Sequence, residues 1–226
     1  MKSPADDDPV QQLLRRRAAV LPSAQENPPR PAPAGPPQTI SLVAIGASTG
    51  GPPALQSLLK AITTEPPFTI AVVQHMTPGF LPGMVRWLAD TTGRRVVLAD
   101  KPLELEPGLV VVAADGGHLE LSKGRLAKVE GPSRRGHCPS IDVLFESIAA
   151  TALASRCLGM LLTGMGEDGA RGLLKLRLAG AYTLAQDEAS SVVYGMPRVA
   201  HDLGADAEQL DLTTLGERLR VLAARP

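Results

Sequence analysis

Three loops of this sequence carry the side chain types that perform acyl transfer. Ser48, His75 and Asp168 each follow shortly after a run of apolar residues. These runs cover residues 40–45, 68–73 and 158–163. In such chemistry a serine hydroxyl attacks a carbonyl carbon, an imidazole takes the hydroxyl proton, and a carboxylate fixes the imidazole tautomer. If the runs are parallel strands, their carboxyl ends meet at the sheet edge where α/β proteins bind ligands. The sequence therefore predicts a Ser-His-Asp site at that edge.

The segment around Ser48 predicts a tight turn between a strand and a helix. It reads Ile45-Gly46-Ala47-Ser48-Thr49-Gly50-Gly51-Pro52, and apolar residues at helical spacing follow it. Glycine permits the positive φ values of such a turn, and proline suits the first position of a helix. The segment also matches G-x-S-x-G, the nucleophile turn of α/β-hydrolases. Those enzymes have the order Ser, Asp/Glu, His, whereas the order here is Ser, His, Asp, so the match does not indicate that fold.

Each of these three residues also has a simpler interpretation. Ser48 could cap the helix that follows it, and Asp168 could cap the helix after its own loop. A single histidine at a strand end, such as His75, is often only a hydrogen-bonded surface residue. The occurrence of all three at one predicted sheet edge favours the catalytic interpretation.

The remaining histidines are weaker candidates. His118 lies in a predicted hairpin and His201 in a late helix, and we expect both to be exposed or structural. His137 lies in the basic loop 134–138, which is compatible either with contact to an acidic substrate or with a solvated loop. Cys138 is not expected to act as a thiol nucleophile with His137, because adjacent loop residues rarely point at one another.

Apolar runs alternate with helical patterns along the chain from about residue 39. Strands are expected at residues 40–45, 68–73, 96–99, 109–113, 118–121, 126–129, 158–163 and 181–185. Helical segments between them predict an α/β fold with a doubly wound, mostly parallel sheet and helices on both faces. The turn Ser122-Lys123-Gly124-Arg125 predicts an antiparallel hairpin at the edge of the sheet. Ser140 is expected to be the N-cap of a helix.

Composition favours a protein that binds neither nucleic acid nor membranes. The 226 residues include 23 basic and 23 acidic side chains, so no concentrated basic face for phosphate binding is indicated. No run approaches the roughly 18 apolar residues of a membrane span, and the N-terminus lacks a signal-peptide pattern. The two cysteines fit neither a disulfide framework nor a metal-ligand spacing. We therefore expect a soluble cytoplasmic protein without a metal site.

Residues 1–38 are predicted to be a disordered, proline-rich leader or linker. They contain nine of the 21 prolines, and proline lacks a backbone N–H group and stops helices. The folded domain is therefore expected over residues 39–226.

Five separated segments carry a family resemblance. They are VAIGASTGG at 43–51, QHMTPGF at 74–80, PSIDVLF at 139–145, LTGMGEDG at 162–169 and AQDEAS at 185–190, with GMP following at 195–197. In this order they resemble the chemotaxis protein-glutamate methylesterases of the CheB type, from about residue 40 to the C-terminus. The family's catalytic serine, histidine and aspartate correspond to Ser48, His75 and Asp168.

The resemblance implies hydrolysis of γ-glutamyl methyl esters on the cytoplasmic helices of chemoreceptors, with release of methanol, and deamidation of certain receptor glutamines. It implies no metal and no organic cofactor. Family members often carry a receiver domain, and residues 1–38 are too short for one. Control by phosphorylation within this chain is therefore not expected, and a separate regulatory protein could supply it. Cys138 and Glu167 stand where the family usually has arginine and asparagine, which bears on receptor specificity.

Two other functions are alternatives. A dinucleotide-binding domain would need glycine in place of Ser48 to complete G-x-G-x-x-G. The acidic residue expected about 20 residues further on is also unclear, because Glu65 lies in a proline-rich turn rather than at a strand end. A non-catalytic receptor-binding scaffold would retain the three residues without using them. Labelling with a fluorophosphonate separates a scaffold from an enzyme, because an unactivated serine does not react.

Overall fold

A computed structural model describes Gly35 and residues 37–225 of the chain. The predicted leader, residues 1–38, therefore lies almost entirely outside the described residues.

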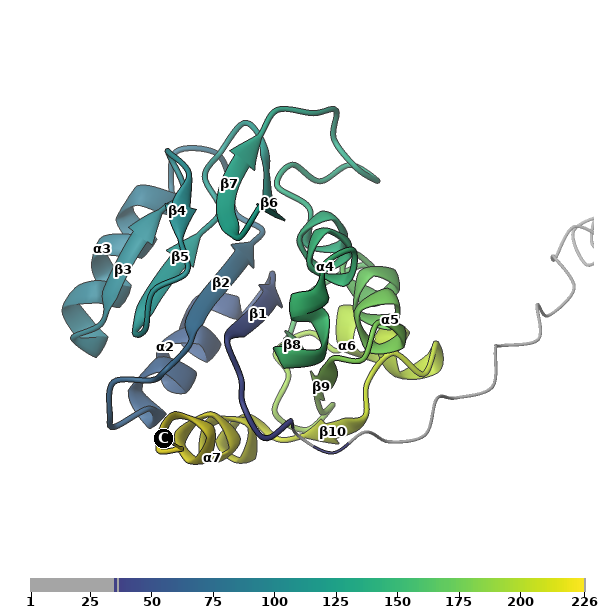
Figure 1. Ribbon diagram of the computed structural model, residues 1–226. Helices are drawn as coiled ribbons and strands as arrows, with labels where there is room; N and C mark the ends of the chain where they lie inside the picture. Colours follow the sequence, from purple (N-terminus) through teal and green to yellow (C-terminus); the bar gives the residue numbers. More distant parts are fainter. Residues whose placement is uncertain (1–34, 36, 226) are drawn as a thin grey trace, which may run out of the picture. The chain divides into compact units, whose positions relative to one another are not determined.

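A seven-stranded sheet forms the centre of the fold (Figure 1). Its strand order is β10-β9-β8-β1-β2-β5-β3, and each pair of neighbours is parallel. The strands are β1 Leu42–Ala47, β2 Thr69–Gln74, β3 Arg95–Leu98, β5 Leu109–Val112, β8 Cys157–Leu161, β9 Tyr182–Gln186 and β10 Glu208–Leu210. All but β10 coincide with predicted strands to within about two residues at each end.

Helices cover both faces of this sheet and enclose two hydrophobic cores. Helices α2, α3 and α7 pack on one core, and α4, α5 and α6 pack on the other. Their bounds are α2 Gly51–Ala61, α3 Leu81–Thr92, α4 Ile141–Ala149, α5 Ala170–Leu178, α6 Met196–Asp202 and α7 Leu212–Ala223, and a 3₁₀ helix, η2 Ala152–Arg156, precedes β8.

The residues of β1 show how one strand serves both cores. Val43 and Ile45 belong to the core beneath α2, whereas Leu42 and Ala44 belong to the core beneath α4. Successive side chains of a strand point to opposite faces, so an uninterrupted apolar run fills both cores at once. This arrangement confirms the doubly wound, mostly parallel α/β fold.

The path of the chain across the sheet reverses at β1. This strand continues into α2 on one face, whereas its neighbour β8 leads to α5 on the other face. Connections that leave in opposite directions open a crevice at the carboxyl ends of the two strands. The loops that contain Ser48 and Asp168 border this crevice, and His75 follows β2 on the other side of β1.

The predicted hairpin is present, but it belongs to a second, smaller sheet. Strands β6 His118–Ser122 and β7 Arg125–Val129 pair antiparallel, and β4 Leu103–Glu104 joins the outer side of β7. Lys123 and Gly124 form the turn with φ values of 50° and 77°, as in the hairpin turns that need two left-handed residues. Apolar residues on one face of the hairpin are buried against α4 rather than beside the main sheet. This packing explains why the hairpin is not an edge of the large sheet.

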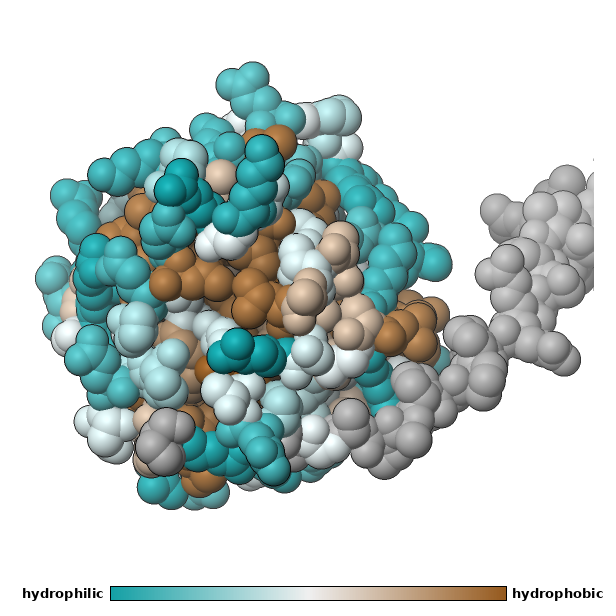
Figure 2. All heavy atoms as spheres, in the orientation of Figure 1, coloured by the Kyte–Doolittle hydropathy of each residue, from teal (hydrophilic) through white to brown (hydrophobic). Residues whose placement is uncertain are grey.

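Hydrophobic and hydrophilic residues are unevenly distributed over the face of the molecule seen in Figure 2. Figure 2 shows hydrophobic residues near the middle of the face, with hydrophilic residues around them. Among the described helices, none combines the length and the hydrophobicity that a membrane span requires.

Candidate active site

Ser48 lies at the carboxyl end of β1, on the turn that leads into α2. Its N–H group donates to Thr163 O at 3.0 Å, and its carbonyl oxygen accepts from Gln74 Nε2 at 2.9 Å and from Gly51 N at 2.8 Å. These bonds hold the turn to both neighbouring strands. The N-cap of α2 is Gly50, and no side chain caps this helix. Ser48 therefore does not serve as the helix cap.

Two glycines make the close approach at Ser48 possible. Gly50 has φ of 81°, a left-handed value that residues with a Cβ rarely adopt. A Cβ added to Gly164, in the loop after β8, would lie 2.6 Å from Ser48 Cβ. The sequence motifs therefore contain glycine because the two loops touch beside the serine.

His75 directly follows β2, just as Ser48 directly follows the neighbouring strand β1. Residues Ala47 and Gln74 are partners in the register of β1 and β2, and His75 N donates to Ala47 O at 2.9 Å. The ring nitrogen Nε2 of His75 lies 2.8 Å from Oδ2 of Asp168. An ionised carboxylate only accepts hydrogen bonds, so Nε2 carries the proton and Nδ1 has the free lone pair. Nδ1 is buried and has no partner among the described residues.

Asp168 is the most heavily bonded side chain of the site. It is 1% exposed and, besides His75, it accepts from Ser140 Oγ at 2.8 Å, Ile141 N at 2.7 Å and Asp142 N at 3.2 Å. Burial by itself would raise the pKa of Asp168, but the hydrogen bonds from His75, Ile141 and Ser140 outweigh it and lower the pKa to about 2. Asp168 is therefore an anion that keeps the His75 tautomer fixed.

The capping role expected of two residues is changed by this network. Asp168 does not cap α5, whose N-cap is Gly169 without a side-chain bond, and it instead binds the first N–H groups of α4. Ser140 is the N-cap residue of α4, as predicted, but its hydroxyl donates to Asp168 instead of accepting from the helix backbone. The buried carboxylate thus takes over the cap of α4.

His118 and His201 lie outside this group. His118 is buried in β6, where Nδ1 accepts from Ser140 N at 3.1 Å and Nε2 lies 3.0 Å from Pro132 O. His201, in α6, lies 3.1 Å from Asp206 Oδ2. Both have structural partners, in agreement with the expectation for them.

His137 is the residue of this site that sequence reasoning missed. Its ring stacks on the ring of His75, with centroids 4.1 Å apart and an angle of 14° between the planes. The arginines of its loop are paired with acidic side chains: Arg134 with Glu146 and Arg135 with Glu167. The loop is thus neither simply solvated nor a set of unpaired cations. The position of His137 just before the segment that begins at Pro139 was the available signal.

The three potential ligand atoms of His75, His137 and Asp168 lie within 4.8 Å of one another. A metal ion bound by two imidazoles lies close to the plane of each ring, because the nitrogen lone pairs lie in those planes. Two rings stacked at 14° have nearly parallel planes. Their lone pairs do not converge, so this arrangement fits a stacked pair better than a metal centre.

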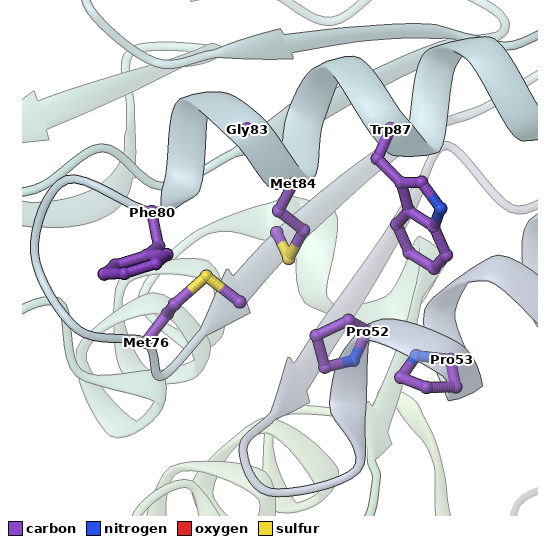
Figure 3. Close-up of a pocket in the computed structure, with 7 residues that line it drawn as sticks. All are labelled: Pro52, Pro53, Met76, Phe80, Gly83, Met84 and Trp87. Atoms are coloured by element: carbon purple, nitrogen blue, oxygen red, sulfur yellow. The ribbon is translucent and has the colours of Figure 1, made fainter.

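An apolar groove of about 420 Å³ includes Met76, the residue after His75, in its wall (Figure 3). It lies between the first turns of α3 and the start of α2, and it is lined by Pro52, Pro53, Met76, Phe80, Gly83, Met84 and Trp87. Two aromatic side chains on its wall are accessible, Phe80 at 65% and Trp87 at 38%. Because Met76 follows His75 directly, the groove lies next to the loop of His75.

Comparison with known proteins identifies the family. A family model described as CheB methylesterase matches residues 43–219. The chain belongs to the CheB methylesterase family. This confirms the resemblance seen in the five sequence segments.

Two curated proteins named as methylesterases are similar to this chain in sequence. Protein-glutamate methylesterase FrzG of Myxococcus xanthus is 45% identical over 209 residues, which are 92% of this chain and 62% of FrzG. A protein-glutamate methylesterase/protein-glutamine glutaminase 3 of Myxococcus xanthus strain DK1622 is 47% identical over 192 residues, 84% of this chain and 54% of that protein. The chain thus spans less than two thirds of the length of these curated relatives.

A solved structure supports the same assignment. The crystal structure of the Thermotoga maritima CheB methylesterase catalytic domain superposes with a TM-score of 0.76 at 30% sequence identity. The match covers 81% of this chain and 99% of that chain. The likeness therefore extends over the whole of that CheB catalytic domain.

The two departures from the CheB pattern have visible surroundings. Glu167 forms an ion pair with Arg135 at 2.7 Å, which links the loop of Asp168 to the loop of His137. Cys138 is a half-buried free thiol that precedes a cis proline, Pro139. The acidic side chain at position 167 is therefore the partner of Arg135 in an ion pair.

Replacing Gly164 by alanine should disturb Ser48. The new Cβ would lie 2.6 Å from Ser48 Cβ and 2.8 Å from Met196 Cε, so one of the two loops has to shift. We expect the rate of Ser48 labelling by a fluorophosphonate to fall at least about tenfold, since small misplacements at reacting groups are costly. Circular dichroism checks that the variant is folded. Labelling of a folded Gly164→Ala protein at the wild-type rate would contradict this account.

Asp168 should make stability sensitive to acid. Its pKa is about 2 in the folded protein and near 3.8 when the chain is unfolded. Because the folded pKa is lower, the carboxylate stabilises the fold fully above about pH 4, and this contribution, roughly 2 kcal/mol, is lost as the pH falls towards about 2. Urea unfolding of wild type and Asp168→Asn should therefore show a stability difference that shrinks between about pH 6 and pH 3. A difference independent of pH would show that Asp168 has an ordinary pKa.

Proposed function

We propose that residues 39–226 form the catalytic domain of a protein-glutamate methylesterase with Ser48, His75 and Asp168 as its triad. The hydrogen bond between His75 Nε2 and the buried Asp168 carboxylate carries this proposal, because it leaves Nδ1 as a base beside the serine strand. Membership of the CheB methylesterase family and the names of the relatives support the same reaction.

In the proposed reaction, Ser48 Oγ attacks the carbonyl carbon of a glutamyl methyl ester while His75 Nδ1 takes the hydroxyl proton. The resulting imidazolium is stabilised by Asp168, and it returns the proton to the departing methoxy group, so that methanol leaves. Water then attacks the acyl-enzyme with His75 again as base, which releases the receptor with a free glutamyl carboxylate and returns the proton to Ser48 Oγ. No hydrogen bond joins Ser48 to His75 among the described residues, and such bonds often tighten only when substrate binds.

Backbone N–H groups next to Ser48 are suited to hold the negative oxygen of the tetrahedral intermediate. The N–H groups of Gly51 and Gly164 are already bonded, to Ser48 O and Val193 O. Those of Thr49 and Met165 have no hydrogen-bond partner within the described residues. Thr49 also precedes α2, whose N-terminus carries positive partial charge. We therefore assign the oxyanion site to Thr49 N and the loop that begins at Met165.

The substrates we propose are the methylated glutamates on cytoplasmic helices of chemoreceptors, which places the enzyme in the cytoplasm. The same acyl chemistry deamidates a glutamine, because an amide carbonyl reacts like the ester and ammonia leaves in place of methanol. The glutaminase names of several relatives support this second activity. The proposal needs neither a metal nor an organic cofactor.

Substitution of the nucleophile tests the reaction directly. Ser48→Ala should remain folded and release methanol from a methylated receptor fragment at least about a thousandfold more slowly, as when other serine hydrolases lose their nucleophile. Ser57, an exposed serine of α2, supplies the matched control as Ser57→Ala. Undiminished release by Ser48→Ala would exclude Ser48 as the nucleophile. Failure of a fluorophosphonate to label wild type would instead favour a scaffold.

The apolar groove next to His75 is the surface that we propose contacts the receptor helix on one side of the ester. Large exposed aromatic side chains mark interaction sites, and this chain has three phenylalanines and one tryptophan in all. Phe80 and Trp87 are both on the groove wall. The groove starts at the residue after His75, so a helix lying in it passes directly over the catalytic loop.

Removing an aromatic group from the groove should affect binding more than chemistry. Phe80→Ser should raise KM for a methylated receptor fragment about tenfold, since burying a phenylalanine ring contributes on the order of 1.5–3 kcal/mol. The turnover of a small ester such as p-nitrophenyl acetate should stay within about twofold, because it does not reach the groove. Leu178→Ser, on the exposed side of α5, is the control. Equal losses with both substrates would mean that Phe80 supports the catalytic loop instead.

A further inference from the structure

The catalytic role proposed for His75 requires that its ring be held in one orientation, and the bond to Asp168 does not achieve this alone. A single hydrogen bond at Nε2 fixes one point of the ring but permits rotation about the line between Nε2 and Oδ2. Such rotation would change the direction in which Nδ1 points. Nδ1 has no partner of its own in the described chain that would prevent it.

The face of the His75 ring is covered by His137. The centroids of the two rings are 4.1 Å apart and their planes differ by 14°, so the rings are in van der Waals contact over their faces. Contact across a whole face opposes the rotation that the hydrogen bond permits. In this geometry no ring nitrogen of His137 points along the plane of His75, so His137 does not exchange a proton with it.

The backbone of His137 is itself fixed. Arg134 and His137 exchange two backbone hydrogen bonds, each of 2.9 Å, around a turn in which Gly136 has φ of 86°. Arg134 binds Glu146 of α4 through both guanidinium nitrogens, at 2.6 and 2.9 Å. Bidentate pairs of this kind have defined geometry as well as charge attraction. The turn is therefore anchored to the same helix whose N-terminus holds Asp168.

We propose that His137 is a positioning residue, which holds the His75 imidazole flat so that Nδ1 faces Ser48. The proposal rests on the function assigned to His75 above. It assigns the stacking face of His137, not its nitrogens, as the part that matters. A planar ring at position 137 should therefore be sufficient, and an aliphatic side chain of similar size should not be.

Three variants test this proposal: His137→Phe, His137→Leu and His137→Ala. Phe keeps a flat ring without nitrogen atoms, Leu fills the space without a flat face, and Ala leaves it empty. We expect the rate of Ser48 labelling by a fluorophosphonate to fall ten- to a hundredfold in the Leu and Ala variants, as for other small misplacements of catalytic groups. The Phe variant should stay within about threefold of wild type. His201→Ala is the control, since that histidine lies outside the site.

Kinetics on an ester separate positioning from binding. The Leu and Ala variants should lose kcat for methanol release with KM changed less than about twofold. Wild-type rates in His137→Leu and His137→Ala, or a Phe variant as slow as these two, would overturn the proposal. Labelling by a fluorophosphonate reports on Ser48 without the receptor. If wild type failed to release methanol, the proposed substrate would be wrong, but the labelling rates of the His137 variants relative to wild type would still test the role of His137.

Discussion

The buried carboxylate of Asp168 is the group on which the rest of the site depends. It receives hydrogen bonds from His75, from the Ser140 hydroxyl and from the first N–H groups of α4. A carboxylate buried this deeply is stable as an anion only because several donors and the positive end of a helix compensate for lost water. One side chain therefore joins the loop after β8, the loop after β2 and the N-terminus of α4.

Much of this arrangement follows from the order of residues in the sequence. The loops of Ser48, His75 and Asp168 were predictable because the carboxyl ends of parallel strands lie at one edge, and apolar runs reveal those strands. Strands β4 and β10 were not predictable, since they have only two and three residues and their side chains are not fully buried. A short, half-exposed strand has no hydrophobic pattern to detect.

The features that sequence reasoning missed at the site depend on contacts distant in the chain. His137 stacks on a residue 62 positions before it, and no local spacing encodes that contact. Ser140 followed the local rule for a helix N-cap, but its hydroxyl donates to the ionised Asp168, a strong acceptor, instead of accepting from a backbone N–H group. In both places contacts with residues distant in the chain decided the role, and only the N-cap position of Ser140 was correctly anticipated.

The proposed use of Nδ1 as the base has a consequence for how this site tolerates change. Nδ1 is bonded to the ring carbon nearest the backbone, so the serine must come from a chain segment very close to that of His75. Neighbouring strands of a sheet lie about 4.8 Å apart, and β1 and β2 are such neighbours. The spacing of nucleophile and base is thus set by ladder hydrogen bonds at Ala47 and Gln74. The register of these two strands, and not the length of the connection between them, therefore sets this spacing.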